Sequence, residues 1–240
     1  MLRSLFVFFP LSLLATTLPQ AGDAGAKQAV EATHTERLDF AQGGVIRVDG
    51  SYGGLTVEGW DQPAVEITVT KFRGYYEPKL HDQAAKNFDK VLVMAERRSD
   101  KELEISVTVP ARRWFLPPLL TSDRAGVSLE WHINAPRDSK LVINHGTGSV
   151  LVSNMIADIE AVGHRGDVML MLPDSGSYAI DAKTKIGVVT SDFAGVPHPR
   201  GYRLGERYAT ANSPSSRRIY LRVSFGGITI LAAPPEAYGR

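Results

Sequence analysis

A five-residue pattern in the second half of the chain decides the fold that the sequence predicts. Gly148-Ser149-Val150-Leu151-Val152 recurs as Gly166-Asp167-Val168-Met169-Leu170 and again as Gly187-Val188-Val189-Thr190. The leading glycines are 18 and then 21 residues apart. Short alternating runs lie between the copies, at 158–162 and 178–182. Each unit therefore predicts two short strands joined by a tight corner, with Gly148, Gly166 and Gly187 as structural turn glycines.

The pattern extends toward both ends of the chain. Gly226-Gly227-Ile228-Thr229-Ile230-Leu231 is a late copy, and Gly53-Gly54-Leu55-Thr56-Val57 is an early one. One two-strand unit cannot bury its apolar face, but stacked units share a continuous core. We therefore expect an all-β fold, a β-solenoid or parallel β-helix-like stack of short strands. An antiparallel β-sandwich with hairpins of similar length is the alternative.

The first half of the chain adds strands and one helix. Alternating apolar and polar residues at 55–60, 65–71 and 102–109 are typical of half-buried strands. One short helix is expected near 79–88, where Ala84, Ala85 and Phe88 have helical spacing. Residues 198–216 are expected to form a long polar loop.

The N-terminus predicts export. Residues 1–21 combine Arg3 with an apolar run and small residues, which is typical of a signal peptide, with cleavage expected within 21–26. An uncleaved anchor is the alternative interpretation. Residues 22–37 are expected to be a linker, 38–235 the β domain and 236–240 a tail. No second apolar run follows, so we expect no transmembrane segment after signal removal and a location in the periplasm, at the cell surface or outside the cell.

Composition excludes several classes of function. The 27 Lys and Arg residues nearly balance the 26 Asp and Glu residues, and Arg3 is the one charged residue in the predicted signal. A neutral mature chain gives no electrostatic case for nucleic-acid binding. The sequence has no cysteine. Disulfides, thiol catalysis and thiolate metal sites are therefore excluded.

Two stretches resemble the bacterial putative-adhesin domain family of unknown function. The first runs from Gly43-Gly44-Val45-Ile46-Arg47-Val48 through Val57-Glu58-Gly59-Trp60-Asp61-Gln62-Pro63 to Ile67. The second is Pro136-Arg137-Asp138 with the glycine repeats that follow it, to about Asp192. The resemblance covers roughly residues 38–231 and rests on structural motifs. It implies a β-solenoid-like stack and carries no catalytic residues with it.

No candidate site forms a catalytic or metal-binding pattern. The histidines show no metal-type spacing; His145 and His164 lie near equivalent corners, and we interpret them as surface residues. Arg165-Gly166-Asp167 is an integrin-type tripeptide, yet the repeat itself places a glycine and a polar residue there. Five aspartates recur along the repeats and are interpreted as a solvated face rather than calcium ligands or catalytic acids: Asp158, Asp167, Asp174, Asp181 and Asp192. We therefore expect no catalytic residue, cofactor or metal.

One apolar segment is the candidate for a partner contact. Residues 114–120 read Trp-Phe-Leu-Pro-Pro-Leu-Leu and interrupt the strand pattern. Such a segment either packs against the core as a cap or stays exposed as a contact surface. The contact residues would be Trp114, Phe115, Leu116, Leu119 and Leu120.

The function expected from these patterns is non-enzymatic. We expect an exported envelope protein whose repeat-built β surface has a structural or binding, adhesin-like role toward a protein or surface partner. A periplasmic accessory or signalling module that binds another protein is one alternative. A carbohydrate-active β-helix enzyme is the other, and it would require convergent carboxylates in a cleft.

Overall fold

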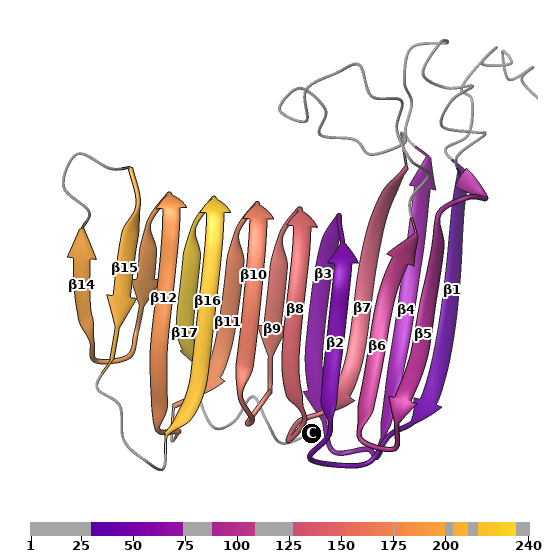
Figure 1. The fold of residues 1–240 in the computed structure, drawn as a ribbon, viewed down its shortest axis with the longest axis horizontal. Helices are drawn as coiled ribbons and strands as arrows, with labels where there is room; N and C mark the ends of the chain where they lie inside the picture. The colour runs from indigo at the N-terminus through magenta and orange to yellow at the C-terminus, as the bar shows by residue number, and fades with distance from the viewer. Residues whose placement is uncertain are drawn as a thin grey trace, which may run out of the picture.

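The computed structural model describes residues 30–73, 88–108, 127–174, 176–199, 204–210 and 216–233. These residues form an all-β fold of two mixed sheets, with the strands side by side along the long axis of the molecule (Figure 1). The order of the eight-stranded sheet is β1 (Val30–Asp39), β4 (Ala64–Arg73), β7 (Ser128–Pro136), β3 (Gly54–Trp60), β9 (Val150–Ser153), β11 (Val168–Pro173), β17 (Ile228–Ala233), β13 (Val189–Ser191). The order of the nine-stranded sheet is β14 (Val196–Pro199), β15 (Glu206–Ala209), β12 (Tyr178–Ile186), β16 (Arg217–Phe225), β10 (Ile159–Arg165), β8 (Lys140–Thr147), β2 (Val45–Ser51), β6 (Glu102–Thr108), β5 (Leu92–Ser99).

The middle of both sheets is parallel and the ends are antiparallel. Strands β7, β3, β9, β11, β17 and β13 pair in parallel in one sheet. Strands β6, β2, β8, β10, β16 and β12 do so in the other. At the ends, β1 and β4 pair antiparallel beside β7, β5 pairs antiparallel with β6, and β15 and β14 pair antiparallel beside β12.

The chain passes repeatedly from the nine-stranded sheet to the eight-stranded sheet. It does so from β2 to β3, β8 to β9, β10 to β11, β12 to β13 and β16 to β17. The last pair does not continue the stack in chain order. Instead, β16 and β17 lie between the β10–β11 pair and the β12–β13 pair. The β16–β17 pair, although last in the sequence, therefore separates two pairs that precede it in the chain.

The corners between the paired strands lie one on another. The N–H of Gly148 donates to the carbonyl of Arg165 at 2.8 Å, and the N–H of Gly166 donates to the carbonyl of Phe225 at 2.9 Å. Both glycines have positive φ, +127° and +121°. A Cβ on Gly166 would lie 1.9 Å from the carbonyl oxygen of Gly148. Only glycine allows both this backbone conformation and this approach of neighbouring corners.

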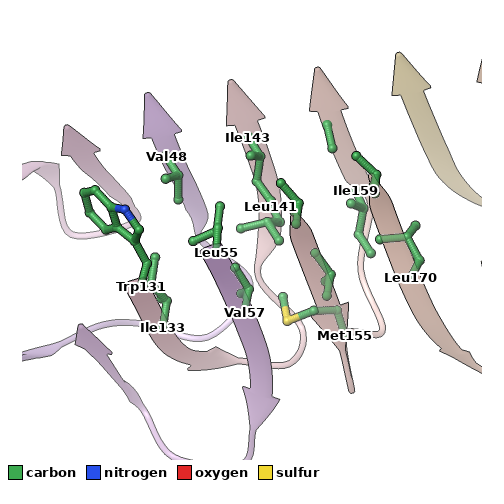
Figure 2. Packing of buried hydrophobic residues seen from close by; sticks show 14 of the residues in the cluster. Val48, Leu55, Val57, Trp131, Ile133, Leu141, Ile143, Met155, Ile159 and Leu170 are labelled. Carbon is green, nitrogen blue, oxygen red and sulfur yellow. The ribbon is translucent and has the colours of Figure 1, made fainter. Parts of the chain in front are cut away.

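A single apolar core lies between the two sheets. Inward-facing residues alternate with outward-facing ones along each strand, as in Leu55 and Val57 of β3. Figure 2 shows residues of both sheets in this core, with Val48, Leu141 and Ile143 from one sheet and Trp131, Ile133 and Leu55 from the other. Burial of one such aliphatic side chain stabilises the fold by about 1.5–3 kcal/mol. The continuous core is what makes the short, individually unstable strands hold together.

Several boundaries differ from those expected. The linker predicted over 22–37 is too long, because β1 begins at Val30 and pairs with β4 over its whole length. The loop predicted over 198–216 contains β15, which bridges β12 and β14 through backbone hydrogen bonds. The predicted signal, tail and apolar 114–120 segment lie outside the described residues, as does the helix expected near 79–88 except for Phe88. Among the described residues, no helix is both long enough and apolar enough to cross a membrane.

Candidate functional site

A polar hollow lies on the outer face of the eight-stranded sheet, over its three neighbouring strands β3, β4 and β7. Its volume is about 350 Å³, and it is open to solvent. The residues that line it are Gly54, Thr56, Thr68, Thr70, Glu130, Trp131 and His132. The side chain of Trp131 is buried and its Nε1 donates to the carbonyl of Tyr52 at 2.9 Å, so it belongs to the core side of the strand.

Strand register sets the positions of the polar side chains. Thr56 lies opposite His132, which lies opposite Thr68 on the next strand. Glu130 occupies the adjacent row, opposite Gly54 on one side and Thr70 on the other. Alternate residues of a strand face the same side, so the two rows form a small grid on one surface. Chain positions far apart, such as 56 and 132, thus meet through sheet pairing.

Glycine at position 54 contributes to the depth of the hollow. A Cβ at Gly54 would meet only Cγ of Glu130, at 3.9 Å, which is ordinary van der Waals contact. The backbone of Gly54 does not have a positive φ, unlike that of Gly53. A larger side chain is therefore compatible with the strand and would fill the hollow.

Two of the three threonines of the hollow, Thr68 and Thr70, contact neighbours on β1. Oγ1 of Thr68 lies 2.9 Å from Oγ1 of Thr35, and Oγ1 of Thr70 lies 3.0 Å from Oγ1 of Thr33. A hydroxyl both donates and accepts, so each of these threonines can still bond to a ligand. The wall of the hollow thus offers ordered hydroxyls, one carboxylate and one imidazole. These groups suit recognition of a hydroxylated polar ligand.

The predicted surface position of His145 is wrong. His145 is 2% exposed, and its Nδ1 lies 2.8 Å from Oγ of the buried Ser51. Burial lowers the pKa of His145 from 6.5 to about 4, and backbone groups of Gly53 and Thr147 oppose this shift without offsetting it. His164, in contrast, is exposed. Residues 145 and 163 pair across β8 and β10, so His145 and His164 occupy opposite faces of the sheet.

The Arg165-Gly166-Asp167 tripeptide is tied into the fold at a corner. The guanidinium of Arg165 lies 5.9 Å from the ring centroid of Phe225. Oδ1 of Asp167 accepts a hydrogen bond from the N–H of Gly227 at 2.7 Å. Both charged side chains therefore contact the C-terminal strand pair, and both have a structural role at this position.

Two further repeat aspartates bind the same strand pair. Oδ1 of Asp158 accepts from the N–H of Arg218 at 2.8 Å, and Oδ2 of Asp192 accepts from the N–H of Ala232 at 3.1 Å. With Asp167, they supply three carboxylates to backbone donors of residues 217–233. These three aspartates are therefore more than a solvated face. Their carboxylates help to hold the β16–β17 pair in the stack.

The remaining two aspartates have separate surroundings. Asp181 accepts from Arg222 at 2.6 Å and from Arg207 at 3.1 Å. Burial acts to raise the pKa of Asp181, but the hydrogen bonds and charges of these arginines lower it below its usual value. Asp174 donates its backbone N–H to the carbonyl of Ala233 at 3.4 Å. Among the described residues, no cluster of three or more histidines and acidic residues is arranged to hold a metal ion.

Sequence patterns do not single out most of this site. In the sequence His132 is one histidine among six, and the threonines are parts of alternating strands. The alternation does indicate which side chains face outward. It does not indicate that β7 lies between β4 and β3, and this neighbourhood is what assembles the hollow.

Comparisons with known proteins found solved structures that resemble this one at low sequence identity. No family model matches the sequence, and no curated protein matches it. The structure is similar to that of a putative cell adhesion protein from Clostridium sporogenes ATCC 15579, with a TM-score of 0.50 and 14% identity over 86% of this chain and 100% of that one. It is also similar to a putative adhesin from Bacteroides fragilis NCTC 9343, with a TM-score of 0.32 and 10% identity over 83% of this chain and 97% of that one. The first likeness concerns the fold alone, and the second is too loose to support an argument.

Proposed function

We propose that the chain is an exported, non-enzymatic envelope protein of the adhesin-like type. In this proposal the outer face of the eight-stranded sheet is a binding surface, and its ligand is a hydroxyl-rich saccharide of a cell surface. The observation that carries the proposal is the hollow over β3, β4 and β7, because it gathers threonine hydroxyls, a carboxylate and an imidazole on one face of the sheet. Such groups donate to and accept from sugar hydroxyls.

Two further observations support the proposal. The N-terminal sequence is typical of an export signal. A solved structure named as a putative cell adhesion protein shares the fold, with all of its length covered. Membership of the bacterial putative-adhesin family is part of the same proposal, on the motifs of residues 43–67 and 136–192.

We further propose that the two sheets are best understood as the faces of a short solenoid. Five strand pairs each pass from one sheet to the other at a corner, and each pairs in parallel with its neighbour. A sandwich of hairpins would be dominated by antiparallel neighbours. A solenoid repeats its outward side chains at the strand spacing of about 4.8 Å, which suits a polymeric ligand.

A carbohydrate array followed by calorimetry tests the binding proposal. The purified chain is applied to immobilised bacterial and host oligosaccharides, and the strongest ligand is titrated against wild type and variants. Gly54→Val fills the hollow and should weaken binding at least tenfold with little effect on stability, since the site accepts a Cβ. Thr190→Val, on β13 in the same sheet row as Thr56, is the matched control and should bind as wild type does. Absence of any saccharide ligand, or equal binding by Gly54→Val, would reject the proposal.

A further inference from the structure

The edge strands at the two ends of the stack differ in how readily they could pair with another strand. At the end formed by β13 and β14, both edges are blocked. β14 contains Pro197 and Pro199, which have no N–H to offer a new strand. β13 has only three residues, and the N–H of Val189 donates to Oε2 of Glu206 at 2.9 Å.

The core at this blocked end is also closed by aromatic residues. The ring of Phe193 meets the ring of Tyr178 edge-on, with centroids 5.2 Å apart. The hydroxyl of Tyr208 donates to the carbonyl of Phe193. Both tyrosines are buried. The described residues of this end therefore offer few free backbone groups to another strand, although Val188, Val196 and Leu204 expose apolar side chains.

Among the described residues, the opposite end leaves a long strand edge without a pairing strand. Strand β1 has ten residues, no proline and a paired neighbour on one side only within the described chain. Its core-facing residues Ala32 and Leu38 are only partly buried against the core. The other edge at this end, β5, is eight residues long and exposes about half of Leu92 and of Met94. Proteins usually block such edges, because a row of free N–H and carbonyl groups pairs readily with another strand.

We propose that β1 is a self-association edge, on which a second copy of this chain adds its own β1 in antiparallel pairing. The two eight-stranded sheets would then form one continuous sheet across a twofold axis. The charges on β1 favour one register, in which His34 lies on the axis. Glu31 of each copy then faces Arg37 of the other, and Thr33 faces Thr35 on the same outer surface.

The neighbouring registers are less favourable. A register centred on Thr35 would place Glu31 opposite Asp39 twice, and like charges directly opposite are destabilising. A register centred on Thr33 would lose both Glu31–Arg37 pairs. Arg37 also lies 3.4 Å from Glu66 of its own chain. The guanidinium of Arg37 also donates to Gln62 and lies 5.1 Å from the ring centroid of Trp60. The side chain of Arg37 is 49% exposed and that of Glu66 30%, so the internal pair contributes little, and Arg37 turns from these contacts to pair with Glu31 of the second copy. The proposal is independent of the ligand of the hollow.

Single cysteines test the register directly, because the chain has none of its own. In the proposed dimer the two Cα atoms of residue 34 lie about 4.5–5.5 Å apart, within the range of roughly 4.4–6.8 Å that a disulfide spans. His34→Cys should therefore cross-link nearly completely under mild oxidation. Glu31→Cys, on the same strand, is the matched control. In the proposed register the two copies of residue 31 lie about 20 Å apart, so this variant should not cross-link. Equal cross-linking of both variants, or of neither, would overturn the proposal.

Sedimentation equilibrium of the intact chain from about 1 to 100 μM gives the second readout, with concentrations chosen for interface affinities in the micromolar range. Wild type should show a dimer, and Glu31→Arg and Arg37→Glu should each weaken it at least tenfold. An equimolar mixture of these two variants should recover wild-type association, because at both positions an arginine of one variant then faces a glutamate of the other. A monomer at all concentrations, or a dimer whose dissociation constant is unchanged by both charge reversals, would reject β1 as the interface between two copies. The β1 edge would then be available to a different protein.

Discussion

Oγ of Ser51 lies 2.8 Å from Nδ1 of His145, and both side chains are buried between the sheets. The two residues face each other across β2 and β8. A neutral imidazole shares one hydrogen bond with this hydroxyl through Nδ1, while its Nε2 is buried without a hydrogen-bond partner among the described residues. A charged imidazolium would have to lose its hydration without an opposite charge beside it, and this explains why the pKa of His145 falls to about 4.

The stability of the fold should therefore depend on pH through His145. Its native pKa of about 4 is below the unfolded value of 6.5, so the unfolded chain binds the extra proton between these values. Its contribution is fully present above pH 6.5 and is lost as the pH falls toward 4. The full loss corresponds to about 3 kcal/mol of unfolding free energy. Urea unfolding measured at several values across this window should show it.

His145→Asn is the control for this pH dependence. Asparagine can still bond to Ser51 but does not titrate, so the variant should be less stable at neutral pH and change less between pH 6.5 and 4. The slopes of the two proteins should differ by about one proton near pH 5. Parallel slopes would show that other groups cause the acid sensitivity.

Substitution of a stacked corner glycine should be far more damaging than substitution of another glycine with positive φ. Gly166→Ala adds a Cβ 1.9 Å from the carbonyl oxygen of Gly148 and also strains the backbone. We expect a loss of about 4 kcal/mol or more in unfolding free energy. In Gly50→Ala the added Cβ meets nothing within 4 Å, so the loss should be only about 1–2 kcal/mol. Equal losses in chemical denaturation would contradict the role of the stack.

The carboxylate of Asp167 should stabilise the C-terminal strand pair by accepting from Gly227. Asp167→Ala removes the acceptor and should cost about 1 kcal/mol, the usual value of such a bond at an exposed position. Asp167→Asn keeps an oxygen at Oδ1 and should lose less than half of this amount. Thermal unfolding of both variants gives the comparison. A melting temperature of Asp167→Ala equal to that of wild type would mean that the hydrogen bond contributes nothing.

Local sequence patterns predict where the strands lie along the chain, but they do not predict how the strands are arranged in the two sheets. Alternation in residues 55–60 and 65–71 predicts half-buried strands, which the structure places at β3 and β4. The recurring units, in which a glycine is followed two residues later by a valine, predict corners followed by strands, and they lead into β9, β11 and β13. Both signals come from residues close together in the chain, where periodicity reports which side chains must be buried.

Long-range pairing explains what the sequence could not predict. Nothing near Arg217–Phe225 indicates that β16 enters between β10 and β12. The polar residues around Glu206 resemble a loop, and β15 is a strand only because β12 and β14 flank it. His145 occurs in an alternating run in which its neighbours are as polar as those of a surface strand. The hollow depends on the same kind of neighbourhood, since β3, β4 and β7 are separated by connections of different length.

The apolar segment at 114–120 supports a last prediction, because its two expected roles have opposite consequences. If Trp114 and Phe115 contact an envelope partner, Trp114→Ser with Phe115→Ser should leave the melting temperature unchanged and abolish retention on an envelope preparation. If they pack against the core, the double substitution should cost several kcal/mol. For a chain of this length that loss lowers the melting temperature by roughly 10 °C. Leu204→Ser, at a side chain that is 74% exposed, is the control for removing a surface apolar group and should change neither readout.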